Sequence, residues 1–173
     1  MCYTLGDKTC YALEGAVEVA GAAVQWARKV GLAPKDHAKM EEEALSVPDC
    51  GDVYFVPAFT GIFSPYWDDS ARGCLIGMSF NTERGHMMRA LYEAPALRST
   101  EVIQAMVKDS GMDVPRLMVD GGMTVNDTLM QMQADFSKAV IVRKEEKEIT
   151  AMGAGIAAGL FVKFWNSTDD VKS

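Results

Sequence analysis

Residues 119–126, VDGGMTVN, are the strongest candidate for a binding site in this sequence. A short apolar run ends there, Gly121 and Gly122 turn the chain, and a helix is expected to follow. Paired glycines lack the Cβ atoms that would keep a ligand away from the backbone. A helix start also offers unpaired N–H groups and a partial positive charge. Thr124 and Asp127 have the spacing of a capping box, so Thr124 is expected to cap the helix. An ordinary turn that needs positive φ explains the same residues, and spacing alone favours it.

Two other segments are rich in small residues. Ala20–Ala23 precede Gln25, which lies four residues after Gly21 and therefore one turn further along the same helix face. Small residues allow the close approach of either another helix or a flat ligand. Residues 153–159 form the second such segment, and Thr150 is expected to cap its helix. Helix packing is the plainer interpretation of both segments.

The loop at residues 64–73, SPYWDDSARG, combines two rings with three charged side chains. Asp68, Asp69 and Arg72 could bind a ligand or hold the loop in place, and internal ion pairs are the plainer interpretation. His86, alone in a methionine-rich helix, is expected to be structural. No P-loop, nucleophile elbow or HExxH pattern is present.

The elements that must position these residues alternate between strand-like and helix-like segments, which predicts an α/β or mixed α+β domain with helices covering a sheet. Helices are expected at residues 14–30, about 83–109, 125–136 and 150–164; strands at 2–4, 9–13, 53–59, near 74–79, 116–120 and 139–143. Residues 35–52 are expected to form a short surface helix or a loop. Pro95 should kink or split its helix, because it lacks an N–H donor.

Length and composition limit the possible functions. A chain of 173 residues fits one domain or a large piece of one. The net charge of −7, without any run of Lys and Arg, argues against nucleic-acid binding. The longest apolar stretch, residues 151–165, is shorter than the roughly 20 residues that a bilayer needs, and the start of the chain has no signal-peptide pattern. A cytoplasmic location is expected.

The four cysteines, at positions 2, 10, 50 and 74, form no CxxC pair. With only two histidines in the chain, a zinc cluster is not expected, and we predict no metal-binding residue. Scattered cysteines of this kind suit buried thiols in a reducing compartment.

Residues 73–93, GCLIGMSFNTERGHMMRALYE, resemble the C-terminal signature of the FGGY carbohydrate kinases. The residues at its fixed positions are Gly73, Gly77, His86, Ala90 and Glu93. The flanking segments YALEGAVEVAGAAVQW, VYFVPAFTGIFSPYWDDSARG, KDSGM and VDGGMTVNDTLMQMQAD resemble the glycerol kinase branch of that family. The resemblance extends from about Tyr3 to Trp165.

This resemblance implies an actin-like, ribonuclease-H-like fold and transfer of the ATP γ-phosphoryl group, with Mg²⁺, to glycerol. The nucleotide contacts would be Gly21, Gln25, Gly122 and Asn126, the two glycines acting by leaving room. The chain would be one partial C-terminal domain (residues 1–173), cut at both ends. The catalytic base and the glycerol-binding residues would then lie in an absent N-terminal domain, so the isolated chain is expected to be inactive. The complete protein would be a cytoplasmic homo-oligomer of glycerol metabolism.

Two departures and two alternatives accompany this interpretation. The family commonly has a second Asn where this chain has Asp127, and a helix former where it has Pro95. The chain could instead be an inactive module that retains nucleotide or subunit contacts, or a purely structural actin-like domain. ATP binding without glycerol phosphorylation would favour the module.

Overall fold

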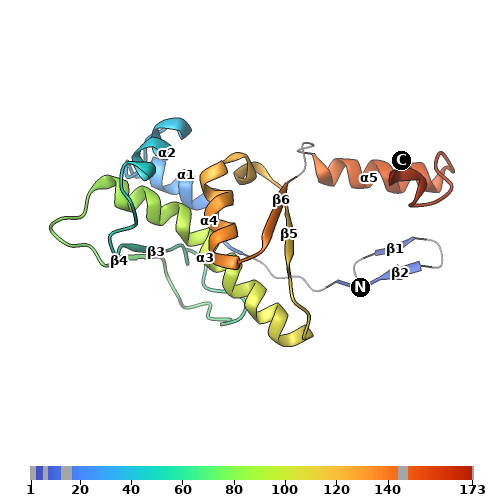
Figure 1. Cartoon of the computed structure of the whole chain (residues 1–173), viewed down its shortest axis with the longest axis horizontal. Helices are drawn as coiled ribbons and strands as arrows, with labels where there is room; N and C mark the ends of the chain where they lie inside the picture. Colours follow the sequence, from blue (N-terminus) through green and yellow to red (C-terminus); the bar gives the residue numbers. More distant parts are fainter. Residues whose placement is uncertain (1–2, 6–7, 13–16, 144–147, 173) are drawn as a thin grey trace. The chain divides into compact units, whose positions relative to one another are not determined.

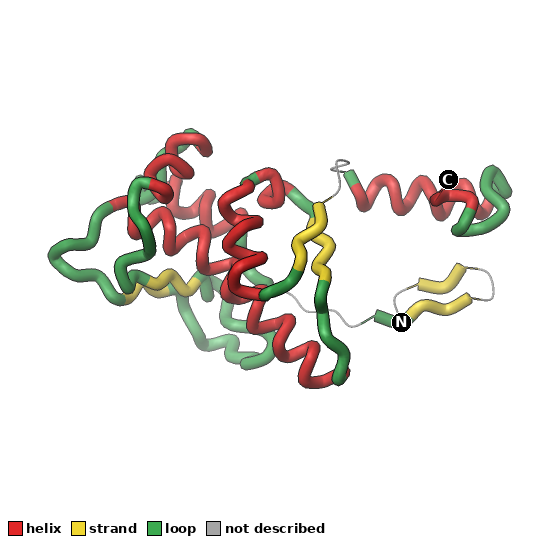
Figure 2. Tube along the Cα trace, viewed as in Figure 1, coloured by secondary structure: helices red, strands yellow, loops and turns green. Residues whose placement is uncertain are grey.

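The computed structural model describes residues 3–5, 8–12, 17–143 and 148–172. The chain divides into two compact units, one of residues 1–14 with 143–173 and one of residues 15–142. Figures 1 and 2 show their helices and strands. None of the helices in the described residues combines the length and the apolarity needed to cross a bilayer.

The smaller unit consists of a hairpin and a helix. Strands β1 (Tyr3–Leu5) and β2 (Lys8–Cys10) pair in antiparallel fashion, and helix α5 (Ile149–Phe161) is followed by the short 3-10 helix η2 (Asp170–Lys172). The expected strand at 9–13 ends at Cys10, and residues 13–16 lie outside the described residues.

Helix α5 differs from its prediction at both ends. Thr150 lies within the first turn instead of capping it, and the helix stops at Phe161 instead of residue 164. The reason is a reversal of the chain that brings the Trp165 ring over Gly159, where an added Cβ would lie 2.4 Å from the ring atom Cζ3. Added Cβ atoms at Gly153 and Gly155 would meet none of the described residues within 4 Å. Of these three glycines, only Gly159 is needed for a close approach within the described part of the chain, and its neighbour is a ring instead of a second helix.

The larger unit carries the remaining elements. They are α1 (Gly21–Lys29), α2 (His37–Leu45), β3 (Tyr54–Val56), β4 (Cys74–Ile76), α3 (Arg84–Ser110), β5 (Arg116–Val119), the 3-10 helix η1 (Gly122–Val125), α4 (Asp127–Ser137) and β6 (Val140–Arg143). Strands β3 and β4 are antiparallel, with Phe55 opposite Leu75, and β5 pairs with β6. The described residues thus contain three two-stranded sheets, whereas the sequence predicts helices over a single sheet.

The core of this unit surrounds α3, which packs against α2, α4 and β3 (Figure 1). Its fully buried large side chains are Met40, Val53, Met88 and Leu91. Each such side chain contributes roughly 1.5–3 kcal/mol when it leaves water. The α3 helix is thereby the scaffold on which the neighbouring helices are placed.

Two helix predictions in this unit need correction. Residues 17–20 are not helical, and α1 begins at Gly21 instead of residue 14. Val17 and Val19 are β-branched, a side-chain type that weakens helix formation and favours extended backbone. The second correction concerns Pro95, for which the sequence predicts a kink or a split: the split is wrong, because the helix is continuous from Arg84 to Ser110. Pro95 is buried there, and packing on three neighbouring elements offsets the roughly 3 kcal/mol that an interior proline costs.

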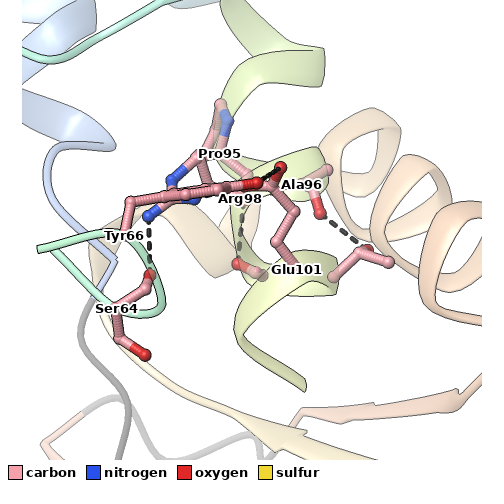
Figure 3. A network of polar contacts seen from close by, with 8 residues as sticks. Ser64, Tyr66, Pro95, Ala96, Arg98 and Glu101 are labelled. Carbon is pink, nitrogen blue, oxygen red and sulfur yellow. Dashed lines mark hydrogen bonds and ion pairs between the residues drawn. The ribbon is translucent and has the colours of Figure 1, made fainter. Parts of the chain in front are cut away.

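The loop at residues 64–73 is held against α3 by a polar network (Figure 3). Arg98 donates to the Ser64 carbonyl at 2.8 Å and forms an ion pair with Glu101. The Tyr66 hydroxyl donates to Glu101 at 3.1 Å, and the Arg98 guanidinium lies 5.6 Å from the Tyr66 ring centre. These contacts favour the structural interpretation of the loop, with the anchoring charges coming from α3.

His86 is structural, as predicted. Its Nδ1 accepts the Glu83 N–H at 2.9 Å and closes a capping box at the start of α3. The cysteines fit their prediction less well, because only Cys50 of the described ones is buried and Cys74 is exposed. Burial, and then the neighbouring Glu93 carboxylate, raise the pKa of the Cys50 thiol.

Gln133 on α4 offers a direct test of the core. It is 5% exposed, and its Nε2 has no hydrogen-bond partner among the described residues. We expect Gln133→Met, which keeps the shape and removes the unpaired donor, to raise the free energy of unfolding by about 1 kcal/mol in urea denaturation. The control is Gln131→Met, which removes an exposed hydrogen bond to Asp135 and should not stabilise the protein. Destabilisation by Gln133→Met would contradict the prediction.

Candidate functional site

A pocket of about 400 Å³ lies where several helical elements of the larger unit meet. Its lining comes from α1, α2, α3, η1 and the start of α4, and consists of Val24, His37, Ala38, Glu41, Tyr92, Gly122, Met123, Val125 and Asn126. The volume is within the range of small-molecule sites. The glycine turn that the sequence singles out therefore opens onto a real cavity.

The two glycines of this turn have different roles. Gly121 has a φ of +94°, a backbone conformation that side chains rarely adopt, so it makes the turn. Gly122 does not need that conformation, and an added Cβ there would meet nothing within 4 Å. The turn explains Gly121 alone. Gly122 faces open space at the pocket.

Asn126 caps the helix that follows, where the sequence predicts that Thr124 would. The Asn126 Oδ1 accepts the Leu129 N–H at 2.6 Å, while the Thr124 hydroxyl donates to the Gly121 carbonyl at 2.8 Å. The cap moves because η1 lies between the turn and α4, so the first residue of α4 is Asp127. The Asn126 side chain is consequently fixed at the pocket edge.

Gly21 and Gln25, the two predicted site residues of α1, differ in their position relative to the pocket. Gly21 starts α1, and an added Cβ there would lie 3.6 Å from Cγ and 3.8 Å from Sδ of Met123. The α1 start and the η1 turn are thus adjacent, as a shared site requires. Gln25 is exposed and is not among the lining residues, where α1 contributes Val24 instead. Of the four residues predicted from sequence, Gly122 and Asn126 line the pocket, and Gly21 borders it through Met123.

Sequence reasoning missed the acidic and phenolic groups of the pocket. Glu41 comes from α2, in a segment predicted only as a surface helix or loop, and accepts a hydrogen bond from the Thr128 hydroxyl. Tyr92 comes from α3 and is 2% exposed. Burial and the Glu41 carboxylate raise the pKa of Tyr92, outweighing the lowering by Arg28 and by the Asn126 amide. Its hydroxyl is therefore neutral at pH 7.

His37 is the remaining polar residue of the pocket. Its Nε2 lies 3.0 Å from Nη1 of Arg28, which always carries its protons, so Nε2 accepts this hydrogen bond. The one signal that could have located the α2 residues is Asp36, a helix-capping residue type whose carboxylate accepts the Ala38 N–H at 2.9 Å.

A second pocket of about 340 Å³ lies between β3 and α3. Its lining is mainly apolar, and its charged residues are paired: Arg98 with Glu101, and Glu93 with Arg89 outside the pocket. None of the four residues predicted from the sequence lines it. We therefore place the candidate site at the glycine turn.

The arrangement at the glycine turn defines a class of protein. A strand, β5, leads through a glycine turn to a helix start, and the pocket there combines apolar walls with a few fixed polar groups. Such a pocket is typical of a small-ligand site in a protein of mixed α/β structure. Among the described residues, no three His, Cys, Asp or Glu side chains gather as a protein-bound metal would need.

Comparison with known sequences gives the family. Residues 2–161 match the C-terminal domain of the FGGY family of carbohydrate kinases, and the chain belongs to that family. It is 51% identical over 171 residues to a glycerol kinase of Azorhizobium caulinodans, an alignment that covers 98% of this chain and 34% of the relative. The chain thus spans about a third of the length of the curated relatives it matches.

Solved structures agree with this assignment. The chain superposes on a Plasmodium falciparum glycerol kinase with ADP at a TM-score of 0.78 and 39% identity, covering 88% of this chain and 30% of the other. A gluconate kinase of Lactobacillus acidophilus, at 22% identity and a TM-score of 0.73, shares the fold over 85% of this chain and 30% of its own. The fold is the C-terminal domain of FGGY kinases, with the actin-like, ribonuclease-H-like architecture expected from the sequence.

Proposed function

We propose that this chain provides the adenine-nucleotide side of a glycerol kinase active site. The reaction is the transfer of the γ-phosphoryl group from ATP to glycerol, which gives ADP and glycerol 3-phosphate. The observation that carries the proposal is the pocket at the glycine turn, in a chain about half identical to a glycerol kinase and similar in structure to one described with ADP.

The charges of the pocket favour the nucleoside end of the nucleotide. Glu41 lines the cavity, and Asp127 occupies the first turn of α4. Negative side chains at this place repel phosphate and oppose the attraction of the helix dipole for anions. Val24, Met123 and Val125 supply apolar surface for a planar base. Gly122 leaves the open space that the base or ribose would occupy.

We assign the rest of the reaction to the two thirds of the relatives' length that this chain does not span. Phosphoryl transfer needs several groups placed together on the γ-phosphate and the acceptor. Mg²⁺ would arrive bound to the nucleotide phosphates, as it usually does in kinases, instead of in a protein cage. On this proposal the 173 residues form one partial C-terminal domain, and the complete protein acts in the cytoplasm as a homo-oligomer.

Calorimetry on the 173-residue chain tests the proposal. We expect saturable ADP binding with a Kd of about 1 mM or tighter, and no glycerol 3-phosphate from MgATP and glycerol. Absence of ADP binding by a folded chain would overturn the nucleotide assignment. Turnover by the pure chain would show that the catalytic groups lie within it.

A further inference from the structure

Three polar side chains from three different helix regions meet in the candidate pocket. They are Glu41 of α2, Tyr92 of α3 and Asn126 at the cap of α4. These groups also interact electrostatically: after burial, the Glu41 carboxylate contributes to the raised pKa of Tyr92, while the Asn126 amide lowers that pKa. A ligand in the pocket therefore meets a polar edge made from all three elements.

The Asn126 side chain is already engaged within the protein. Its Oδ1 accepts the Leu129 N–H at 2.6 Å, and its amide acts on Tyr92 by lowering the pKa of that hydroxyl. Glu41 differs, because one oxygen, Oε1, accepts the Thr128 hydroxyl, and Oε2 has no hydrogen bond or ion pair among the described residues. A carboxylate has acceptor atoms only. Glu41, which lines the pocket, thus has one carboxylate oxygen held by Thr128 and one that is unshared among the described residues.

We infer that Glu41 determines base specificity by accepting a hydrogen bond from the 6-amino group of the bound adenine. This inference rests on the proposed function, in which the pocket holds the base of an adenine nucleotide. Adenine carries one donor group on its edge, the 6-amino group, and its other edge atoms are acceptors. A pocket acceptor can therefore pair with adenine at that group alone. The Thr128 hydroxyl holds the carboxylate in place for this contact.

The expected preference is moderate because Glu41 is only half-buried. A fully enclosed acceptor left unpaired would reject an analogue without the donor by several orders of magnitude. Water can reach Glu41 when the donor is missing, so the preference shrinks to that of one hydrogen bond to a charged group, about tenfold to a hundredfold.

The experiment compares ADP with purine riboside 5′-diphosphate, which carries hydrogen in place of the 6-amino group. Calorimetry on the wild-type 173-residue chain should give ADP a Kd about tenfold lower or more. In Glu41→Met, which keeps the length and removes the acceptor, the two Kd values should agree within about threefold. The matched control is Glu42→Met on the exposed neighbour, which makes the same charge change on α2 and should keep the wild-type preference.

The outcomes separate this inference from the function on which it rests. If ADP binds but wild type shows no preference over the purine analogue, the inference alone is wrong, and this comparison needs no variant to fold. The same conclusion follows if Glu41→Met, folded by circular dichroism, keeps the preference. If GDP binds more tightly than ADP, the acceptor serves a guanine base instead. Failure of all nucleotides to bind wild type would remove the proposed function and this inference together.

Discussion

Gly77→Ala is expected to lower the free energy of unfolding by at least about 3 kcal/mol, measured in urea denaturation. Gly77 has a φ of +84°, and an added Cβ there would lie 1.8 Å from the carbonyl oxygen of Asp52. The obstacle is backbone just before β3, and Gly77 follows β4 directly, so relief requires the two paired strands to separate at that end. The unfavourable positive φ and the steric clash with Asp52 both destabilise the folded alanine variant.

Gly31→Ala is the matched control for this substitution. Gly31 has a φ of +80°, nearly that of Gly77, but an added Cβ would meet nothing within 4 Å. The Gly31→Ala substitution has the conformational cost of a positive φ without the clash, so it should lower the free energy of unfolding by about 1 kcal/mol. Equal losses in the two variants would show that the close approach of Gly77 to Asp52 is not maintained in solution.

The contrast between these two glycines shows how far sequence reasoning reaches. The family signature placed Gly77 at a fixed position, while its spacing says nothing about the Asp52 carbonyl, which approaches from a segment 25 residues earlier. Local rules did place the end of the helix expected at about residues 83–109, since α3 ends at Ser110 and Gly111 follows it in a left-handed conformation. Some signals that act within one turn of chain, such as a glycine after a helix, are readable from the sequence. Contacts between distant segments are not.

The same distinction explains the candidate site. The glycine turn was recognisable because a strand, two glycines and a helix start are consecutive in the chain. Glu41 and Tyr92 were not, since they reach the pocket only through the packing of α2 and α4 on α3. Thr124 was mistaken for the cap for a local reason: the 3-10 turn η1 moves the helix start by two residues. A two-residue shift of a helix start is below the resolution of spacing arguments.

Gly122→Val is expected to weaken ADP binding by the 173-residue chain at least about tenfold, a loss of roughly 1.4 kcal/mol. Two methyl groups would enter the part of the pocket where the proposed nucleotide lies. The substitution should leave the thermal midpoint nearly unchanged, because an added Cβ meets nothing within 4 Å and the backbone is not in the left-handed region. Calorimetry with ADP and thermal denaturation on the same sample measure both quantities.

Two further variants make this prediction specific. Gly155→Val introduces the same side chain at another unobstructed glycine, which belongs to α5 and is not among the pocket-lining residues, and should leave ADP affinity unchanged. Gly121→Val, one residue before Gly122, should behave in the opposite way and destabilise the protein by about 1–3 kcal/mol, since its φ of +94° disfavours any side chain. Substitutions at these adjacent glycines should therefore have different effects. Gly121 shapes the turn, so its substitution lowers stability, whereas Gly122 leaves room beside the turn, so its substitution lowers ADP affinity. If Gly122→Val and wild type bind ADP equally well, the nucleotide does not lie against this turn, and the base would have to be placed elsewhere.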